Sequence, residues 1–280
     1  MRHNAVADHH TLKNMLRNLL FFLGLTIVPV AFASDSAKEQ RWSEQIVDAI
    51  LVGEPVWLEA GETRFLGIYT PEISNEAKGG VILLHGMGVH PDWPEVIYPL
   101  RTQLPEYGWA TLAIQMPVLS NDAALADYAP LVPEAAPRIK TAVSYLTKQG
   151  YDNIVLIGHS LGATMGSAYL ATDAPANVIG IVAIGMGTSS LDPKLNNLSH
   201  LEKISVPVFD LYGSRDLDGV RESAKARAKA ARVAGNSGYR QTEVEGANHF
   251  FAGLDDELVR RIRGWLDHVL DFKNSRDLAQ

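Results

Sequence analysis

The feature that most restricts the fold of this chain is a series of short, uninterrupted apolar runs separated by longer stretches with helical periodicity. The runs are Val81–Leu84, Trp109–Ile114, Ile154–Ile157, Val178–Ile184 and Val206–Tyr212. Apolar runs without alternation are typical of strands buried on both faces, as in a parallel sheet. The stretches with helical periodicity are residues 95–106, 134–149, 161–172, 194–203, 219–234 and 255–271. This alternation predicts a doubly wound α/β fold with a mostly parallel sheet.

Further segments extend the pattern at both ends. Residues 38–52 have the periodicity of an amphipathic helix, and Val56–Ala60 and Thr63–Tyr69 flank Gly61-Glu62 as in an antiparallel β-hairpin. Residues Tyr239–Val244 indicate one more strand at an edge of the sheet. The stretch Pro117–Pro133 is proline-rich and irregular, so we expect a lid or binding loop there. The sequence has no inserted segment that would form a large cap domain.

The first 33 residues have the three-part order of a secretory signal peptide. Basic residues precede an apolar run over residues 19–30, and Ala31-Phe32-Ala33 supplies the small residues that a signal peptidase reads. We expect cleavage after Ala33 and a periplasmic or secreted protein, with Met15 as a second candidate for the start of the chain. The alternative is a membrane anchor, but the run is short for a span of about 20 residues.

Behind the signal peptide (residues 1–33) we expect a helical segment over residues 34–54, one α/β domain over residues 55–272 and a tail over residues 273–280. No second long apolar stretch follows, so we expect no membrane span after cleavage. The chain has 25 Lys and Arg against 32 Asp and Glu, a formal net charge of −7, which argues against a nucleic-acid partner. It contains no cysteine, which excludes a disulfide scaffold, a thiolate metal site and a cysteine nucleophile.

The most informative motif is Gly158-His159-Ser160-Leu161-Gly162. It follows an apolar run and opens a helical stretch rich in small residues, which is the context of a G-x-S-x-G nucleophile elbow. A Cβ at position 158 or 162 would collide with neighbouring backbone, and the tight turn leaves the Ser160 hydroxyl exposed at a helix N-terminus. The motif therefore predicts that Ser160 is a nucleophile.

A serine nucleophile needs a base and an acid that orients the base. Of the histidines in the chain, His249 alone is expected in a loop after the last strand, where the chain order Ser, Asp, His requires the base, whereas His268 is expected inside a helix. Asp216 follows the run Val206–Tyr212 and a glycine turn, so its carboxylate is expected level with Ser160. Asp218 is the competing candidate, whereas Asp210 lies inside the strand and is expected to face a helix layer.

A third motif, His85-Gly86-Met87-Gly88, comes directly after the first apolar run. Its glycines allow the backbone to approach an acyl oxygen closely. We expect the amide groups of Met87 and Leu161 to form an oxyanion hole. His90 and Trp93 follow this loop, and they are candidates for substrate binding or for ordinary loop packing.

Together these motifs resemble those of the α/β-hydrolase superfamily over roughly residues 55–272. The segment from His85 to Pro94, with Gly108–Leu112, resembles a bacterial branch of secreted hydrolase-like proteins of unknown function. The resemblance implies a Ser-His-Asp hydrolase, usually an esterase, that uses no metal and no organic cofactor. Its partner would be a small-molecule or envelope-derived acyl substrate.

Two other functions remain open on this sequence. The same triad serves acyltransferases and cofactor-free perhydrolases, and the fold also occurs without catalysis, here as an envelope binding module. A complete nucleophile–base pair argues against the binding module, because binding alone does not need one.

Overall fold

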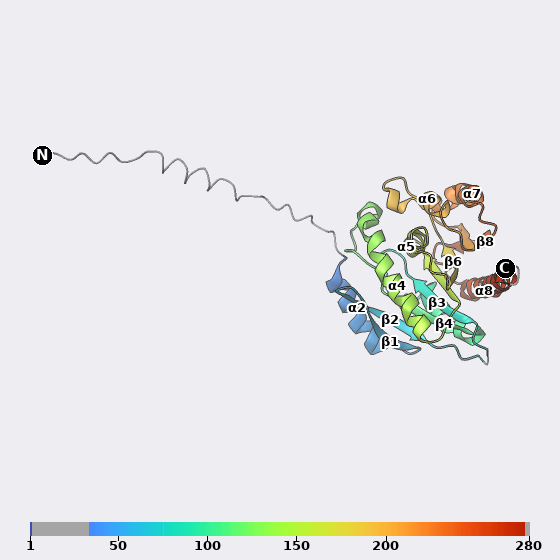
Figure 1. Cartoon of the computed structure of the whole chain (residues 1–280), viewed down its shortest axis with the longest axis horizontal. Helices are drawn as coiled ribbons and strands as arrows, with labels where there is room; N and C mark the ends of the chain where they lie inside the picture. The colour runs from blue at the N-terminus through green and yellow to red at the C-terminus, as the bar shows by residue number, and fades with distance from the viewer. Residues whose placement is uncertain (2–33, 75, 278–280) are drawn as a thin grey trace. The chain divides into compact units, whose positions relative to one another are not determined.

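The computed structural model describes Met1, residues 34–74 and residues 76–277, and the expected signal peptide with its cleavage site lies almost wholly outside them. All described helices and strands belong to one compact unit, residues 33–280. Its centre is an eight-stranded sheet with the order β1-β2-β4-β3-β5-β6-β7-β8. The expected fold class, a doubly wound α/β fold with an antiparallel N-terminal hairpin, is confirmed (Figure 1).

Strands β1 (Glu54–Ala60) and β2 (Thr63–Thr70) form the antiparallel hairpin, and β2 pairs antiparallel with β4. All other neighbours in the sheet are parallel. The parallel strands are β3 (Gly79–Leu84), β4 (Trp109–Ile114), β5 (Ile154–His159), β6 (Val178–Ile184), β7 (Val208–Arg215) and β8 (Tyr239–Asn248). Strands β3 to β6 are buried along their whole length, which is why their sequences are continuous apolar runs.

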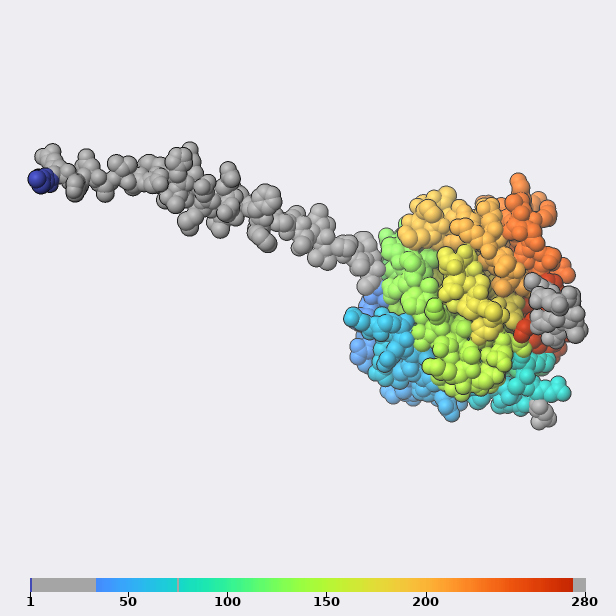
Figure 2. All heavy atoms as spheres, viewed as in Figure 1, coloured from blue at the N-terminus to red at the C-terminus, as the bar shows by residue number. Residues whose placement is uncertain are grey.

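Two layers of helices cover the sheet, and successive strand residues pack into opposite layers. One core contains Ile82 and Leu84 with residues of α4 (Val132–Lys148), α5 (Leu161–Leu170), α6 (Asn197–Leu201) and α7 (Asp218–Val233). The other contains Val81 and Leu83 with residues of α2 (Ser36–Ala49), α3 (Ile97–Gln103) and α8 (Asp255–Asp277). In a space-filling view, the green segments, which include α4, lie beside the blue N-terminal segments of the fold (Figure 2).

The structure differs from the sequence prediction in the stretch Pro117–Pro133. The 3₁₀ helix η2 (Leu125–Leu131) occupies its second half, and α4 already begins at Val132. Pro133 lies in the first turn of α4, where proline has no hydrogen bond to lose, so it starts the helix instead of preventing it. The remaining short helices are η1 (Leu104–Tyr107) and η3 (Pro193–Leu195).

Candidate active site

The elbow motif forms the turn between β5 and α5. Ser160 has φ 53° and ψ −116°, a conformation that side-chain-bearing residues rarely adopt. Its backbone N–H donates to the carbonyl of Ile184 at 2.8 Å, which ties the turn to the end of β6. Strain of this kind, held by the surrounding structure, is common at functional sites.

The two elbow glycines are required by close backbone contacts. A Cβ on Gly158 would lie 2.5 Å from the backbone nitrogen of Ala163. A Cβ on Gly162 would overlap the carbonyl oxygen of Leu84 and would lie 2.5 Å from that of His85. The glycine spacing therefore lets α5 start against the end of β3, as the motif predicts.

The candidate base and acid follow the carboxyl ends of β8 and β7. The Nδ1 of His249 lies 2.6 Å from Oδ1 of Asp216, whose side chain is fully buried. Burial by itself raises the pKa of Asp216, but the hydrogen bond from His249, its charge, and the amides of Leu217 and Gly213 hold that pKa below its ordinary value. An ionised Asp216 accepts the Nδ1–H of His249, which leaves Nε2 free to take a proton.

The competing carboxylates lie elsewhere. The Asp218 side chain is 79% exposed and pairs with Arg221 one turn along α7. Asp210 is fully buried and forms a bidentate ion pair with Arg227 of α7, so it faces a helix layer as expected. Of the three, the structure brings Asp216 to His249.

Ser160 and His249 line one pocket of about 270 Å³ at the carboxyl ends of the strands. Ligands of open α/β sheets bind at this edge, because loops from several strands meet there. The hydroxyl of Ser160 makes no hydrogen bond with a residue in the described ranges. Hydrogen bonds between catalytic groups are often long in the absence of substrate and shorten when substrate binds.

The expected oxyanion groups line the same pocket. Met87 lies in the loop after β3, and Leu161 is the first residue of α5, where backbone N–H groups have no partner within the helix. The ring of His85 holds the Met87 loop: its Nε2 accepts from the amide of Met116, and its Nδ1 donates to the carbonyl of Gly86 at 2.9 Å. Burial lowers the pKa of His85 to about 3, so the ring is neutral, and the Met116 amide that donates to Nε2 places the ring proton on Nδ1.

His90 and Trp93 are not brought to this pocket, whose lining includes neither. The ring of His90 lies edge-on to the rings of Trp42 and Trp93, with centroids 5.4 Å from each. Trp42 comes from α2, so His90 and Trp93 pack this N-terminal helix against the loop after β3. The structure therefore favours loop packing over substrate binding for His90 and Trp93.

Two site residues were not predicted from the sequence as such. His159 is buried in the elbow and its Nε2 donates to the backbone carbonyl of His249 at 2.9 Å, which fixes the loop that carries the base. Gly185 has φ +60°, and a Cβ there would lie 3.0 Å from the His249 ring. The sequence signal for Gly185 is that a glycine directly follows the apolar run Val178–Ile184.

Within residues 34–74 and 76–277, no group of three or more His, Asp or Glu side chains is placed to hold a metal ion. No helix in these ranges is long and apolar enough to cross a membrane.

Solved structures of α/β hydrolases share this fold. Est1E from Butyrivibrio proteoclasticus is 15% identical, with a TM-score of 0.61 over 78% of this chain and 99% of its own. A dienelactone hydrolase from Anabaena variabilis is 22% identical, with a TM-score of 0.61 over 76% and 96%. An alpha-beta serine hydrolase homologue from Coxiella burnetii is 18% identical, with a TM-score of 0.60 over 76% and 98%. At these identities the likeness shows the α/β-hydrolase fold alone.

Sequence comparison adds the family. No curated protein matches the chain. The sequence model of a family described as "Protein of unknown function (DUF3530)" matches residues 29–137 and 131–268, which together are most of the chain. The protein therefore belongs to the DUF3530 family and has the α/β-hydrolase fold.

Proposed function

We propose that this protein is an exported serine hydrolase that cleaves carboxylic esters or related acyl compounds through an acyl-enzyme. The observation that carries the proposal is that strained Ser160 shares one pocket with His249, whose ring is hydrogen-bonded at 2.6 Å to a buried carboxylate. Binding alone would require neither the strained turn nor this pair. Esterases and a lipase among the fold neighbours are consistent with the proposal.

In the first step, His249 Nε2 takes the hydroxyl proton of Ser160 while the oxygen attacks the substrate carbonyl. The amides of Met87 and Leu161 donate to the oxyanion, and one such donor typically contributes about 3 kcal/mol. Asp216 stabilises the imidazolium that forms. His249 then returns the proton to the leaving alcohol as the carbon–oxygen bond breaks.

In the second step, His249 removes a proton from water, which attacks the acyl-enzyme carbonyl. The tetrahedral intermediate uses the same two amides. Collapse releases the carboxylic acid, and the proton on His249 returns to Ser160. An acyltransferase or a perhydrolase would follow the same path with another acceptor in place of water.

The lining of the pocket favours an uncharged acyl group. Besides His249, the lining contains no ionisable side chain, and its other polar side chains are hydroxyls and one amide. Its apolar members are Met87, Leu125, Leu161, Leu195, Leu217 and Val220. A carboxylate or ammonium on the acyl group would lose hydration here without gaining an ion pair.

Nitrophenyl esters of acetate, butyrate and octanoate test this function. The wild type should hydrolyse at least one of them, and Ser160→Ala should lose at least a thousandfold in kcat/KM. Ser144→Ala, an exposed serine on α4, is the matched control and should retain full activity. Equal rates for the Ser160 and Ser144 variants would contradict the proposal. Adding an acceptor alcohol separates hydrolysis from acyl transfer by the ratio of acid to new ester.

Export is the second part of the proposal, and it rests on the order of basic, apolar and small residues before Ser34. Protein isolated from the periplasm or the medium should begin at Ser34 on N-terminal sequencing. Membrane-bound protein that retains residues 15–33 would contradict cleavage.

A further inference from the structure

A carboxylate on the first turn of α4 contacts the backbone nitrogen that signal cleavage would free. Oε2 of Glu134 lies 3.2 Å from the backbone nitrogen of Ser34, and Oε1 accepts the Ser34 hydroxyl at 2.6 Å. Both contacts are partly buried and join residues 100 positions apart in the chain. Ser34 is the first residue after the cleavage site that the sequence predicts.

The charges around this contact are not balanced within the fold. Arg138 is buried and serves two carboxylates at once, Glu39 at 2.8 Å and Glu134 at 3.0 Å. A single cation is therefore shared between two acids. Burial raises the pKa of Glu39, and the guanidinium of Arg138 opposes this rise. When both acids are ionised, the site has one negative charge more than Arg138 neutralises.

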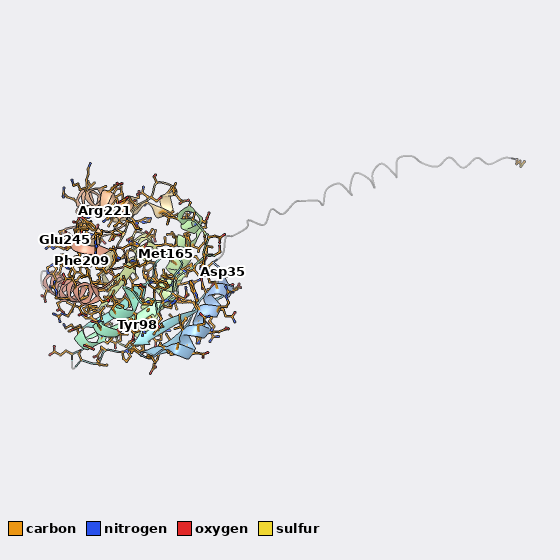
Figure 3. The ribbon with its side chains drawn as sticks, turned by 180° about the vertical axis from the view of Figure 1, so that it is seen from behind. Asp35, Tyr98, Met165, Phe209, Arg221 and Glu245 are labelled. Carbon is orange, nitrogen blue, oxygen red and sulfur yellow. The ribbon has the colours of Figure 1, made fainter. Side chains whose placement is uncertain are left out.

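The other charged groups at this end of α2 do not supply the missing cation. Asp35 caps α2 by accepting the amide of Lys38 (Asp35 is labelled in Figure 3). The ammonium of Lys38 donates to the carbonyl of Leu119 and the side chain of Asn121. Neither side chain therefore neutralises Glu134, which shares the guanidinium of Arg138 with Glu39.

We propose that Glu134 is the binding site for the α-ammonium group of Ser34 that signal-peptide removal creates. Hydrolysis of the Ala33–Ser34 bond turns a neutral amide N–H into a primary amine, which takes up a proton at neutral pH. The same nitrogen then forms an ion pair with Glu134 and supplies the missing positive charge. The inference rests on the proposed cleavage after Ala33 and not on catalysis.

The ion pair also connects to the oxyanion loop. Arg138 Nη1 donates to the carbonyl of Gln115 at 3.0 Å, and the Gln115 side-chain amide lies 3.0 Å from His85 Nε2. His85 in turn holds the carbonyl of Gly86, next to Met87. A series of hydrogen bonds therefore leads from the Glu134 and Arg138 pair to the candidate catalytic loop.

The test compares two chain forms that differ by one residue. Residues 34–280 and 33–280 are each released from a cleavable fusion, so that Ser34 carries either the terminal amine or an amide. Below about pH 8 the form that begins at Ser34 should melt about 2–4 °C higher. Because a carboxylate partner raises the pKa of the amine, this gain should be full below its unfolded value near 7.7 and should disappear as the pH rises through the folded value.

Glu134→Gln should abolish the difference between the two forms, whereas Glu62→Gln, an exposed acid in the hairpin turn, should keep it. The pKa of the Ser34 amine can also be measured in the unaltered protein, from the pH dependence of its acylation followed by mass spectrometry. It should lie about one unit above its ordinary value. Equal melting temperatures, a difference that survives Glu134→Gln, or an ordinary pKa of the amine would each overturn the proposal. Loss of esterase activity alone would not bear on it.

Discussion

Replacing Asp216 by Asn should remove the charge that stabilises His249 in the transition state while keeping the size of the side chain. The two groups are in contact at 2.6 Å and largely shielded from solvent. For charge centres about 4 Å apart and an effective dielectric constant of about 20, the lost stabilisation is about 4 kcal/mol, or roughly a thousandfold in rate. The amide can also select the wrong tautomer of His249, which acts in the same direction.

The assay is kcat/KM on a nitrophenyl ester that the wild type hydrolyses, with Asp218→Asn as the matched control. Asp218 is exposed and pairs with Arg221, so its loss should change the rate less than threefold. Circular dichroism melting should show that both variants are folded. The assignment of the acid would be refuted by a larger loss in Asp218→Asn than in Asp216→Asn.

Three further outcomes follow from the contacts of the site. Gly162→Ala should abolish activity and lower the melting temperature, because its Cβ would overlap backbone atoms. Gly264→Ala, in open space on α8, should be neutral or stabilising by up to about 1 kcal/mol. Equal shifts of the melting temperature in the two variants would contradict the need for a glycine at position 162. His159→Asn should lower kcat roughly tenfold with little change in KM, through loss of the bond to the His249 carbonyl; an unchanged kcat would remove His159 from the site. Burial lowers the pKa of His85 to about 3 and that of His159 to about 4, so below pH 6.5 the unfolded chain takes up protons that the folded chain does not. The free energy of unfolding, measured with urea, should therefore be highest above pH 6.5. It should fall by about 1.4 kcal/mol per pH unit for each of the two rings as the pH is lowered towards 4. A free energy of unfolding that does not change with pH would show that these rings are not buried in the neutral form.

The parallel sheet was predictable because its strands are buried on both faces. Continuous apolar runs such as Ile154–Ile157 arise from that burial, and the elbow glycines are required by contacts within one short turn. The local sequence therefore contains both the pattern of the buried strands and the motif of the elbow. The order of Ser160, Asp216 and His249 along the chain likewise follows from strands that end at one edge of the sheet.

What sequence reasoning missed depends on contacts between distant segments. The bond from His159 to the His249 carbonyl joins residues 90 positions apart. His90 and Trp93 lie next to the oxyanion loop in sequence, but the ring of His90 packs against Trp42 of α2 and against Trp93. Arg227 of α7 and its partner Asp210 in β7 are both fully buried and lie 17 positions apart. None of these pairings has a local pattern.

The central claim is that Ser160 is the nucleophile, and covalent labelling tests it most directly. A fluorophosphonate should add one label to the wild type, and peptide mass spectrometry should locate that label on Ser160. Ser160→Ala should remain unlabelled, and Ser144→Ala should react like the wild type. A wild-type protein that takes no label, or a label on another residue that persists in Ser160→Ala, would contradict the account.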